Sequence, residues 1–205
     1  MKFRFALGVA VLASLPALPV QADLLGLTFA SHISQTDSEP KASSAWQGDM
    51  ELRLKHFVPL IPNVAIGMNK RKQGDAADGS SYQAELYYNL LDTAGFYIDL
   101  GAGYERWDSA NSLLSGTDNG EQMYGVGRVA WHFVGTGFGL ESDLKLSLVD
   151  DDYQANRFRA GVSYELLDLA VSTIDLSAGY LYEDISTRRY STKNNGAYLG
   201  LAVKF

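Results

Sequence analysis

The chain has 205 residues, of which 46% are hydrophobic and 12% aromatic, and its formal net charge is −7 at pH 7. It contains no cysteine, which excludes disulfide bonds, zinc–thiolate centres and thiol catalysis. The acidic balance argues against nucleic acid as a partner, and the composition excludes a disordered chain, collagen and a coiled coil.

Residues 1–22 have the pattern of a secretory signal peptide. Lys2 and Arg4 precede an apolar stretch, and Val20-Gln21-Ala22 then fits the rule of small residues around a cleavage site. Two prolines interrupt the stretch, which is shorter than the roughly 20 apolar residues that a membrane-spanning helix needs. We therefore expect cleavage after Ala22, with residues 23–205 forming the exported domain.

In the exported domain, apolar residues recur at every second position, which is typical of β-strands with one apolar face. We count ten such segments of about nine to twelve residues, the length that a tilted strand needs to cross a bilayer. In chain order, their apolar faces begin at Leu25, Trp46, Val64, Tyr82, Phe96, Val129, Phe138, Phe158, Ile174 and Ala197. Because the segment around Val64 is short, eight strands is the alternative.

The connections between these segments alternate in length and polarity. Short turns are expected at 59–63, 92–95, 134–137 and 167–172, and longer polar links at 36–44, 70–80, 108–120, 150–153 and 185–195. Short turns at one end and longer loops at the other are typical of an outer-membrane barrel. The sequence thus predicts one all-β, antiparallel, up-and-down transmembrane β-barrel with both termini at the periplasmic side.

A soluble periplasmic or lipocalin-like β protein would also show alternation, and two features favour lipid instead. Aromatic residues, among them Trp46, Tyr180 and Trp131, gather near strand ends on the apolar face, as in an interfacial girdle. The chain also ends at Phe205 with Val203 and Leu201 on the same face. This pattern resembles the C-terminal signal that outer-membrane assembly machinery reads.

Two short motifs resemble a family of small Gram-negative outer-membrane β-barrel proteins of uncharacterised function. They are Ala-Asp-Leu-Leu-Gly at 22–26 and Val-Pro-Leu-Ile-Pro-Asn-Val at 58–64, together with the terminal Phe205. The resemblance implies a bacterial outer-membrane location and transfers no catalytic residue.

The opposite face of most strands is charged, and we expect it to line the lumen. Its ten acids are Asp49, Glu51, Glu85, Asp99, Glu105, Glu141, Asp143, Glu165, Asp175 and Glu183, and its seven bases are Arg53, Lys55, Arg128, Lys145, Arg157, Arg159 and Lys204. Since a barrel of about eight strands is just filled by its side chains, we expect ion pairs to plug this lumen. The rival hypothesis is a narrow channel with a weak cation preference, because the lumen charge is −3.

Signals for catalysis are weak, and we predict a protein that is not an enzyme. His32 and Ser34 share a face with Asp49 on the neighbouring strand, so an acyl hydrolase acting on lipid A or phospholipid is a third hypothesis. Such an enzyme needs these groups on the lipid side, whereas they point inward. The acidic run 150–152 lacks the glycine and the final acid of a calcium loop, and we expect no metal or cofactor.

Basic residues also gather in the predicted outward loops: Lys70, Arg71, Lys72, Arg188, Arg189 and Lys193. Arginine and lysine pair well with phosphate, so this cluster is a candidate contact for lipopolysaccharide, with ordinary loop surface as the alternative. The partners expected from sequence are therefore outer-membrane lipid, lipopolysaccharide and the assembly machinery during biogenesis.

Overall fold

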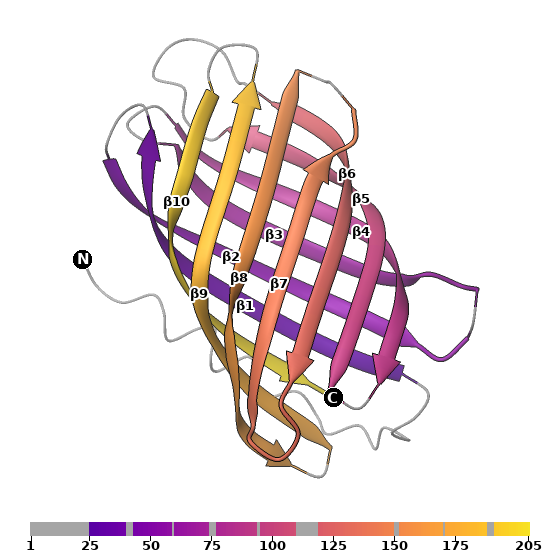
Figure 1. The fold of residues 1–205 in the computed structure, drawn as a ribbon. Helices are drawn as coiled ribbons and strands as arrows, with labels where there is room; N and C mark the ends of the chain where they lie inside the picture. The colour runs from indigo at the N-terminus through magenta and orange to yellow at the C-terminus, as the bar shows by residue number, and fades with distance from the viewer. Residues whose placement is uncertain are drawn as a thin grey trace.

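The computed structural model describes residues 25–39, 43–58, 60–73, 77–93, 95–109, 119–149, 152–169, 171–187 and 191–205. They form ten strands, namely β1 (Leu25–Glu39), β2 (Ser43–His56), β3 (Asn63–Gln73), β4 (Ala77–Thr93), β5 (Phe96–Ser109), β6 (Gly120–His132), β7 (Phe138–Ser147), β8 (Tyr153–Leu169), β9 (Ser172–Thr187) and β10 (Ser191–Lys204) (Figure 1). The expected signal peptide lies outside the described residues. No helix in the described ranges is long and apolar enough to cross a membrane.

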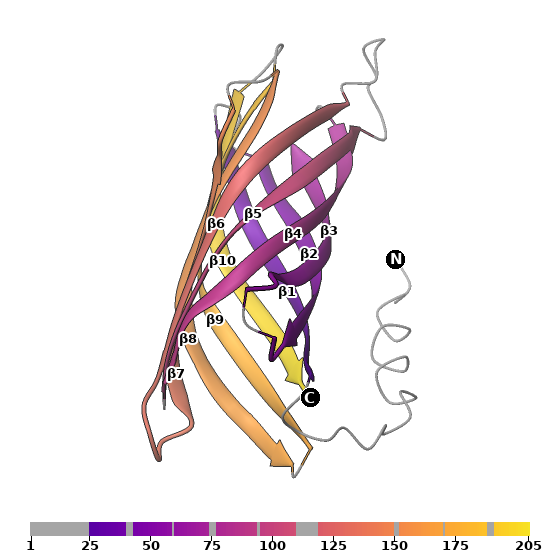
Figure 2. The ribbon, with the colours of Figure 1, turned by 90° about the vertical axis from the view of Figure 1, so that its right-hand side faces the viewer.

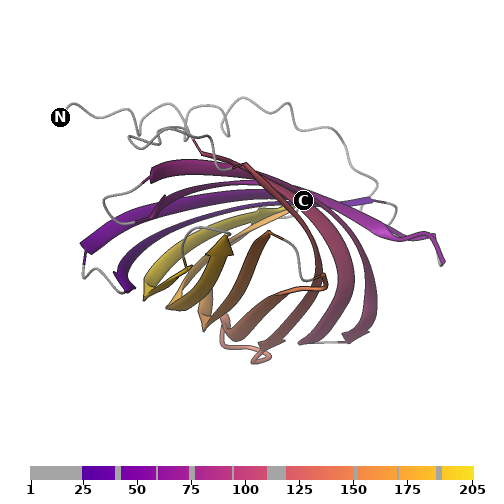
Figure 3. The same ribbon diagram turned by 90° about the horizontal axis from the view of Figure 1, so that it is seen from above.

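Each strand pairs antiparallel with its neighbours in sequence, and β1 closes the barrel against β10. The tilted strands form one continuous wall (Figures 2 and 3). Closure satisfies every strand edge, which is the condition for a β-structure in lipid. The prediction of ten strands is confirmed. The alternative of eight is wrong, because β3 pairs with β4 from Asn63 to Gln73 and forms part of the wall.

The alternation seen in the sequence separates the two faces of this wall. On β4, the Glu85 side chain points inward and is 2% exposed, whereas its neighbour Leu86 points outward and is 54% exposed. The same division holds around the barrel, with Leu52, Leu100 and Leu199 exposed on the outside. Such a belt of exposed apolar side chains is stable only against lipid, and the polar groups are left to fill the lumen.

The two ends of the barrel differ, and we name them by the chain. The terminal end holds Leu25 and Lys204, and the far end holds Glu39 and Ser191. The short turns predicted from sequence lie at the terminal end, where β4 ends at Thr93 and β5 begins at Phe96.

Three of the five predicted long links at the far end are mostly strand. β1 and β2 extend through most of 36–44, β3 and β4 through most of 70–80, and β9 and β10 through most of 185–195. These strands continue past the apolar belt, where both faces are polar and the alternation that marks a strand disappears. Eight of the ten described strands, with 13 to 17 residues, therefore exceed the predicted length, whereas β3 (11 residues) and β7 (10 residues) match it.

The proline-containing motif at 58–64 forms the connection between β2 and β3. Leu60 adopts a left-handed backbone conformation with φ of 72°, and its carbonyl accepts a hydrogen bond of 3.0 Å from the hydroxyl of Tyr88. Asn63 Oδ1 accepts a hydrogen bond of 2.9 Å from the backbone N–H of His56. These bonds hold the turn against the outer wall and leave the Leu60 side chain 90% exposed.

Candidate functional site

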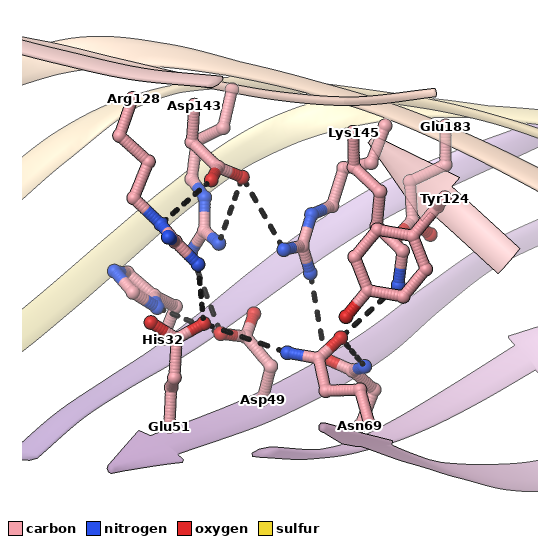
Figure 4. Close-up of polar contacts among 12 residues, drawn as sticks. His32, Asp49, Glu51, Asn69, Tyr124, Arg128, Asp143, Lys145 and Glu183 are labelled. Carbon is pink, nitrogen blue, oxygen red and sulfur yellow. Dashed lines mark hydrogen bonds and ion pairs between the residues drawn. The ribbon is translucent and has the colours of Figure 1, made fainter. Parts of the chain in front are cut away.

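The lumen is the candidate site, because charged groups from opposite walls meet there (Figure 4). Arg128 of β6 is at the centre of the first network. Its Nη2 contacts the Glu85 carboxylate and lies 3.5 Å from Glu51 Oε2, and its Nε lies 3.5 Å from Asp143 Oδ2. Three carboxylates from β2, β4 and β7 thus surround one guanidinium group that is 3% exposed.

Asp143 extends this network toward β8 and β1. Its Oδ1 lies 3.3 Å from Arg157 Nη2 and 3.7 Å from Arg159 Nη2. Nη1 of Arg159 lies 3.4 Å from Asp49 Oδ1, and the same Oδ1 lies 2.8 Å from Nδ1 of His32. Charges that are separated widely in sequence are therefore paired across the lumen, as buried charges require.

A second network lies nearer the far end and joins four buried charges. Glu105 accepts hydrogen bonds of 3.0 Å from Arg71 Nη1 and 2.5 Å from Lys145 Nζ, and a further one of 2.7 Å from Gln122 Nε2. Nε of Arg71 lies 3.4 Å from Glu183 Oε1. These charged side chains are at most 4% exposed.

The position of Arg71 corrects the sequence interpretation, which placed it in a surface cluster. It is 2% exposed, and it donates a hydrogen bond of 2.9 Å to the Tyr153 hydroxyl. β3 continues to Gln73, so the inward positions 63, 65, 67 and 69 are followed by 71. Counting by two along the strand would have found this residue.

A layer of buried aromatic side chains lies beyond the second network. Trp107 and Tyr153 stack with ring centroids 6.2 Å apart and an interplanar angle of 10°, and Ala155 and Ile185 complete a buried cluster. Gly79 admits the indole ring, because a Cβ at that position would lie 1.9 Å from Trp107. Sequence reasoning missed this cluster because aromatic residues were counted on the lipid side.

The terminal half of the lumen is open by comparison. It contains a cavity of about 390 Å³. Arg53, Arg128 and Arg159 contribute to its lining, and the Tyr87, Tyr97 and Tyr198 side chains also line it. Buried side chains therefore occupy the far half of the lumen, whereas the terminal half contains the cavity.

Further polar contacts are made by residues that line the cavity. Lys204 Nζ lies 2.6 Å from Asp175 Oδ2, and the Tyr198 hydroxyl donates a hydrogen bond of 2.9 Å to Glu141. Asp99, which is fully buried, accepts hydrogen bonds from Asn89 and Tyr97 at 2.9 and 2.5 Å.

Two further ion pairs involve residues that line the cavity. Lys55 pairs with Asp92, and both side chains are about half exposed. Arg53 pairs with Glu51 beside the mid-barrel network. Asp92 is a lumen-side charge that the sequence interpretation assigned to a turn.

The set of charged residues that was predicted to line the lumen therefore changes at three positions. Glu165 is exposed, because β8 passes the end of β7 after the pair Phe138↔Tyr164 and a register shift follows between Glu165 and Leu167. Arg71 and Asp92 join the lumen in its place. With eight bases and ten acids, the lumen charge becomes −2.

The groups considered for catalysis lie inside the barrel. His32 contacts Asp49, and the Ser34 side chain points into the lumen and is 4% exposed. None of them faces lipid. In the part of the chain that the structure describes, no three His, Cys, Asp or Glu side chains are arranged to hold a metal ion.

The structure describes part of the predicted lipopolysaccharide cluster and all of the predicted C-terminal assembly signal. Lys70 and Lys193 are exposed, whereas Arg188, Arg189 and the side chain of Lys72 lie outside the described residues. Phe205 pairs with the start of β1: its N–H donates to the Leu27 carbonyl at 2.8 Å, and its carbonyl accepts from the Leu27 N–H at 3.2 Å. Leu201 and Val203 precede it on β10.

Among solved structures, the chain is similar to the β-domain of the Bordetella autotransporter BrkA, with a TM-score of 0.50 and 12% identity over 89% of this chain and 99% of that one. It also matches the transport unit of the autotransporter AIDA-I from Escherichia coli (TM-score 0.43, 9% identity, 97% and 95% covered). A third match is Neisserial surface protein A (TM-score 0.40, 14% identity, 88% and 95% covered).

The similarity to the BrkA domain concerns the fold, which is that of a Gram-negative outer-membrane β-barrel. The expected resemblance to small barrels of this class is thereby confirmed at the level of the fold. No protein-family model matches the chain, and no curated protein sequence matches it significantly.

Proposed function

We propose that the protein is a non-enzymatic outer-membrane β-barrel with a closed lumen and a structural or interaction role. The observation that carries this proposal is the filled far half of the lumen, where the Arg71–Glu105–Lys145 network lies beneath the Trp107–Tyr153 stack. Barrels of this size have room for their own side chains and little more. The inward position of His32 and Ser34 supports the absence of lipid-directed catalysis.

The proposal includes a route to the membrane and an orientation. Residues 1–22 direct export and are removed, residues 23–205 form the barrel, and both termini face the periplasm. The assembly machinery recognises Phe205, Val203 and Leu201. At the cell surface, Lys70, Lys72, Lys193, Arg188 and Arg189 contact lipopolysaccharide phosphates.

Planar-bilayer recording of the purified protein tests the closed lumen. We expect no steady conductance steps. The alternative is a narrow channel with a weak cation preference, and two observations favour it: the cavity of about 390 Å³ in the terminal half and the lumen charge of −2. Steady steps with cation selectivity would establish the channel and overturn the closed lumen.

A further inference from the structure

Five bases and four acids line the cavity in the terminal half of the lumen, and three of the bases are arginines. Arg53, Arg128 and Arg159 line the cavity, and their partners Glu51, Glu85 and Asp49 do not. Asp143, which does line the cavity, is shared among Arg128, Arg157 and Arg159.

Arg128 has unused hydrogen-bonding capacity at this point. Its Nη2 binds the carboxylates of Glu51 and Glu85, whereas its buried Nη1 has no hydrogen-bond partner among the described residues. A buried donor without a partner costs about 1–3 kcal/mol. Nη1 has no exposed surface, so an acceptor in the cavity reaches it only after the Arg128 side chain shifts. Arg53 is the more open neighbour, with its side chain 22% exposed and its Nε directed at Glu51.

The cavity walls suit an organic group beside such an anion. The Tyr87 ring lies beneath the Arg128 guanidinium group, with Cζ 5.6 Å from the ring centroid, and Tyr198 lies similarly against Arg159 at 5.5 Å. Tyr97 lines the same space. The volume of about 390 Å³ falls within the range of about 300–1,000 Å³ that is usual for small-molecule sites.

We propose that this cavity binds a small organic anion with a phosphate or carboxylate group, which enters from the terminal end. The oxyanion accepts hydrogen bonds from the Arg53 guanidinium group, which is partly exposed in the cavity, and the organic part lies against Tyr87, Tyr97 and Tyr198. Guanidinium groups bind these oxyanions with charge-assisted hydrogen bonds. Because the proposed function has the far end closed, the site is a one-ended receptor.

Fluorine NMR of the folded protein in detergent micelles tests the proposal. The probes are 4-fluorophenyl phosphate and 4-fluorobenzoate, with uncharged 4-fluorobenzyl alcohol as the control for partitioning into the micelle. We expect saturable line broadening of at least one anion, weakened by added salt because salt screens the charges. Equal broadening of the alcohol, or none for either anion, would overturn the proposal.

Two variants locate the binding without removing Arg128, which the fold itself needs. Ala202 points inward and lines the cavity, so Ala202→Trp fills the space while the arginines remain; the neighbouring outward Leu201→Trp is its matched control. We expect Ala202→Trp to abolish the broadening and Leu201→Trp to preserve it. Preserved broadening in Ala202→Trp would place the anion elsewhere.

Arg53→Gln tests the charge, because Glu51 retains contacts with Arg128 and Gln83 in that variant. We expect the dissociation constant to rise about fivefold or more, in line with the loss of one charged hydrogen bond. Arg106→Gln, on the exposed outer side, is the control and leaves binding unchanged. An unchanged dissociation constant in Arg53→Gln would contradict the site. Bilayer recording tests the closed lumen, and fluorine NMR tests the anion site. A failure of one proposal can therefore be distinguished from a failure of the other.

Discussion

The ring of Tyr124 lies where a side chain at Gly103 would be. A Cβ built at position 103 would lie 2.5 Å from Tyr124 Cζ, and the Tyr124 ring is fully buried in the lumen. The hydroxyl then donates a hydrogen bond of 2.9 Å to Glu85, a ligand of Arg128. The glycine on β5 therefore sets the position of a residue that supports the charge network.

Replacement of Gly103 by valine is expected to destabilise the barrel, because the new side chain displaces Tyr124 and disturbs its bond to Glu85. Overpacking of this kind costs about 1–3 kcal/mol. Urea unfolding in lipid vesicles, followed by tryptophan fluorescence, measures the change. Gly127→Ala is the control: its Cβ would meet Leu100 at 3.4 Å on the lipid side, and we expect little change. Equal stability of the two variants would contradict the role of Gly103.

Removal of the Lys145 charge is expected to destabilise the barrel more strongly. Lys145→Met leaves Glu105 without its 2.5 Å partner in a site that excludes water. Breaking one side of a buried ion pair costs about 3–5 kcal/mol. The same unfolding assay applies, and the matched control is Lys55→Met at the half-exposed pair with Asp92, where we expect about 0–1 kcal/mol. Similar losses in both variants would mean that the second network is hydrated.

The alternation in the sequence was sufficient to predict the closed barrel and the inward face of most strands. The prediction failed where polar and apolar residues do not alternate along a strand. Beyond the apolar belt both faces are polar, so strand ends such as the one that carries Arg71 read as loops. At Glu165 a register shift breaks the period of two.

The pairing of the lumen charges could not be predicted from the sequence in the same way. Asp49 and Arg159 are 110 residues apart, and they meet only because closure brings β8 opposite β2. The local pattern specifies which face a residue occupies. The distance across the lumen and the side-chain conformation decide its partner.

The proposed contact with lipopolysaccharide is tested by charge reversal at the exposed lysines. Lys70→Glu with Lys193→Glu is expected to reduce the lipopolysaccharide that copurifies with the protein by about two- to fivefold, since exposed ion pairs contribute about 0.2–1 kcal/mol each. Silver-stained gels of the purified protein measure it. Lys55→Glu at the terminal end, which changes the net charge by −2 rather than −4, is the control for position. If the same amount of lipopolysaccharide copurified with the double variant, the proposed contact would be contradicted.

The proposed export signal gives a direct expectation for the mature chain. Intact-mass spectrometry of the protein from outer membranes is expected to find Asp23 as the first residue, because Val20-Gln21-Ala22 fits the cleavage rule. Ala22→Tyr is expected to leave the precursor uncleaved, because a large residue does not fit the cleavage site. A full-length wild-type chain in the outer membrane would contradict the proposed signal peptide.

Two layers of side chains fill the far half of the lumen, the Trp107–Tyr153 stack and the network around Glu105. We therefore expect that removing one layer leaves the lumen closed and that removing both opens it. Trp107→Ala alone is expected to remain closed in planar bilayers, because the network around Glu105 still fills the lumen beneath the stack. A variant that also carries Arg71→Ala and Glu105→Ala removes both layers, and it is expected to show conductance steps because the cavity at the terminal end then connects to the far end.

Heat-modifiable migration on SDS gels must first show that the triple variant is folded. Gly127→Ala, which changes only the lipid side, serves as the folded control that stays closed. Steps in Trp107→Ala alone would mean that the aromatic stack is the sole barrier. A folded triple variant without steps would place the closure outside these two layers.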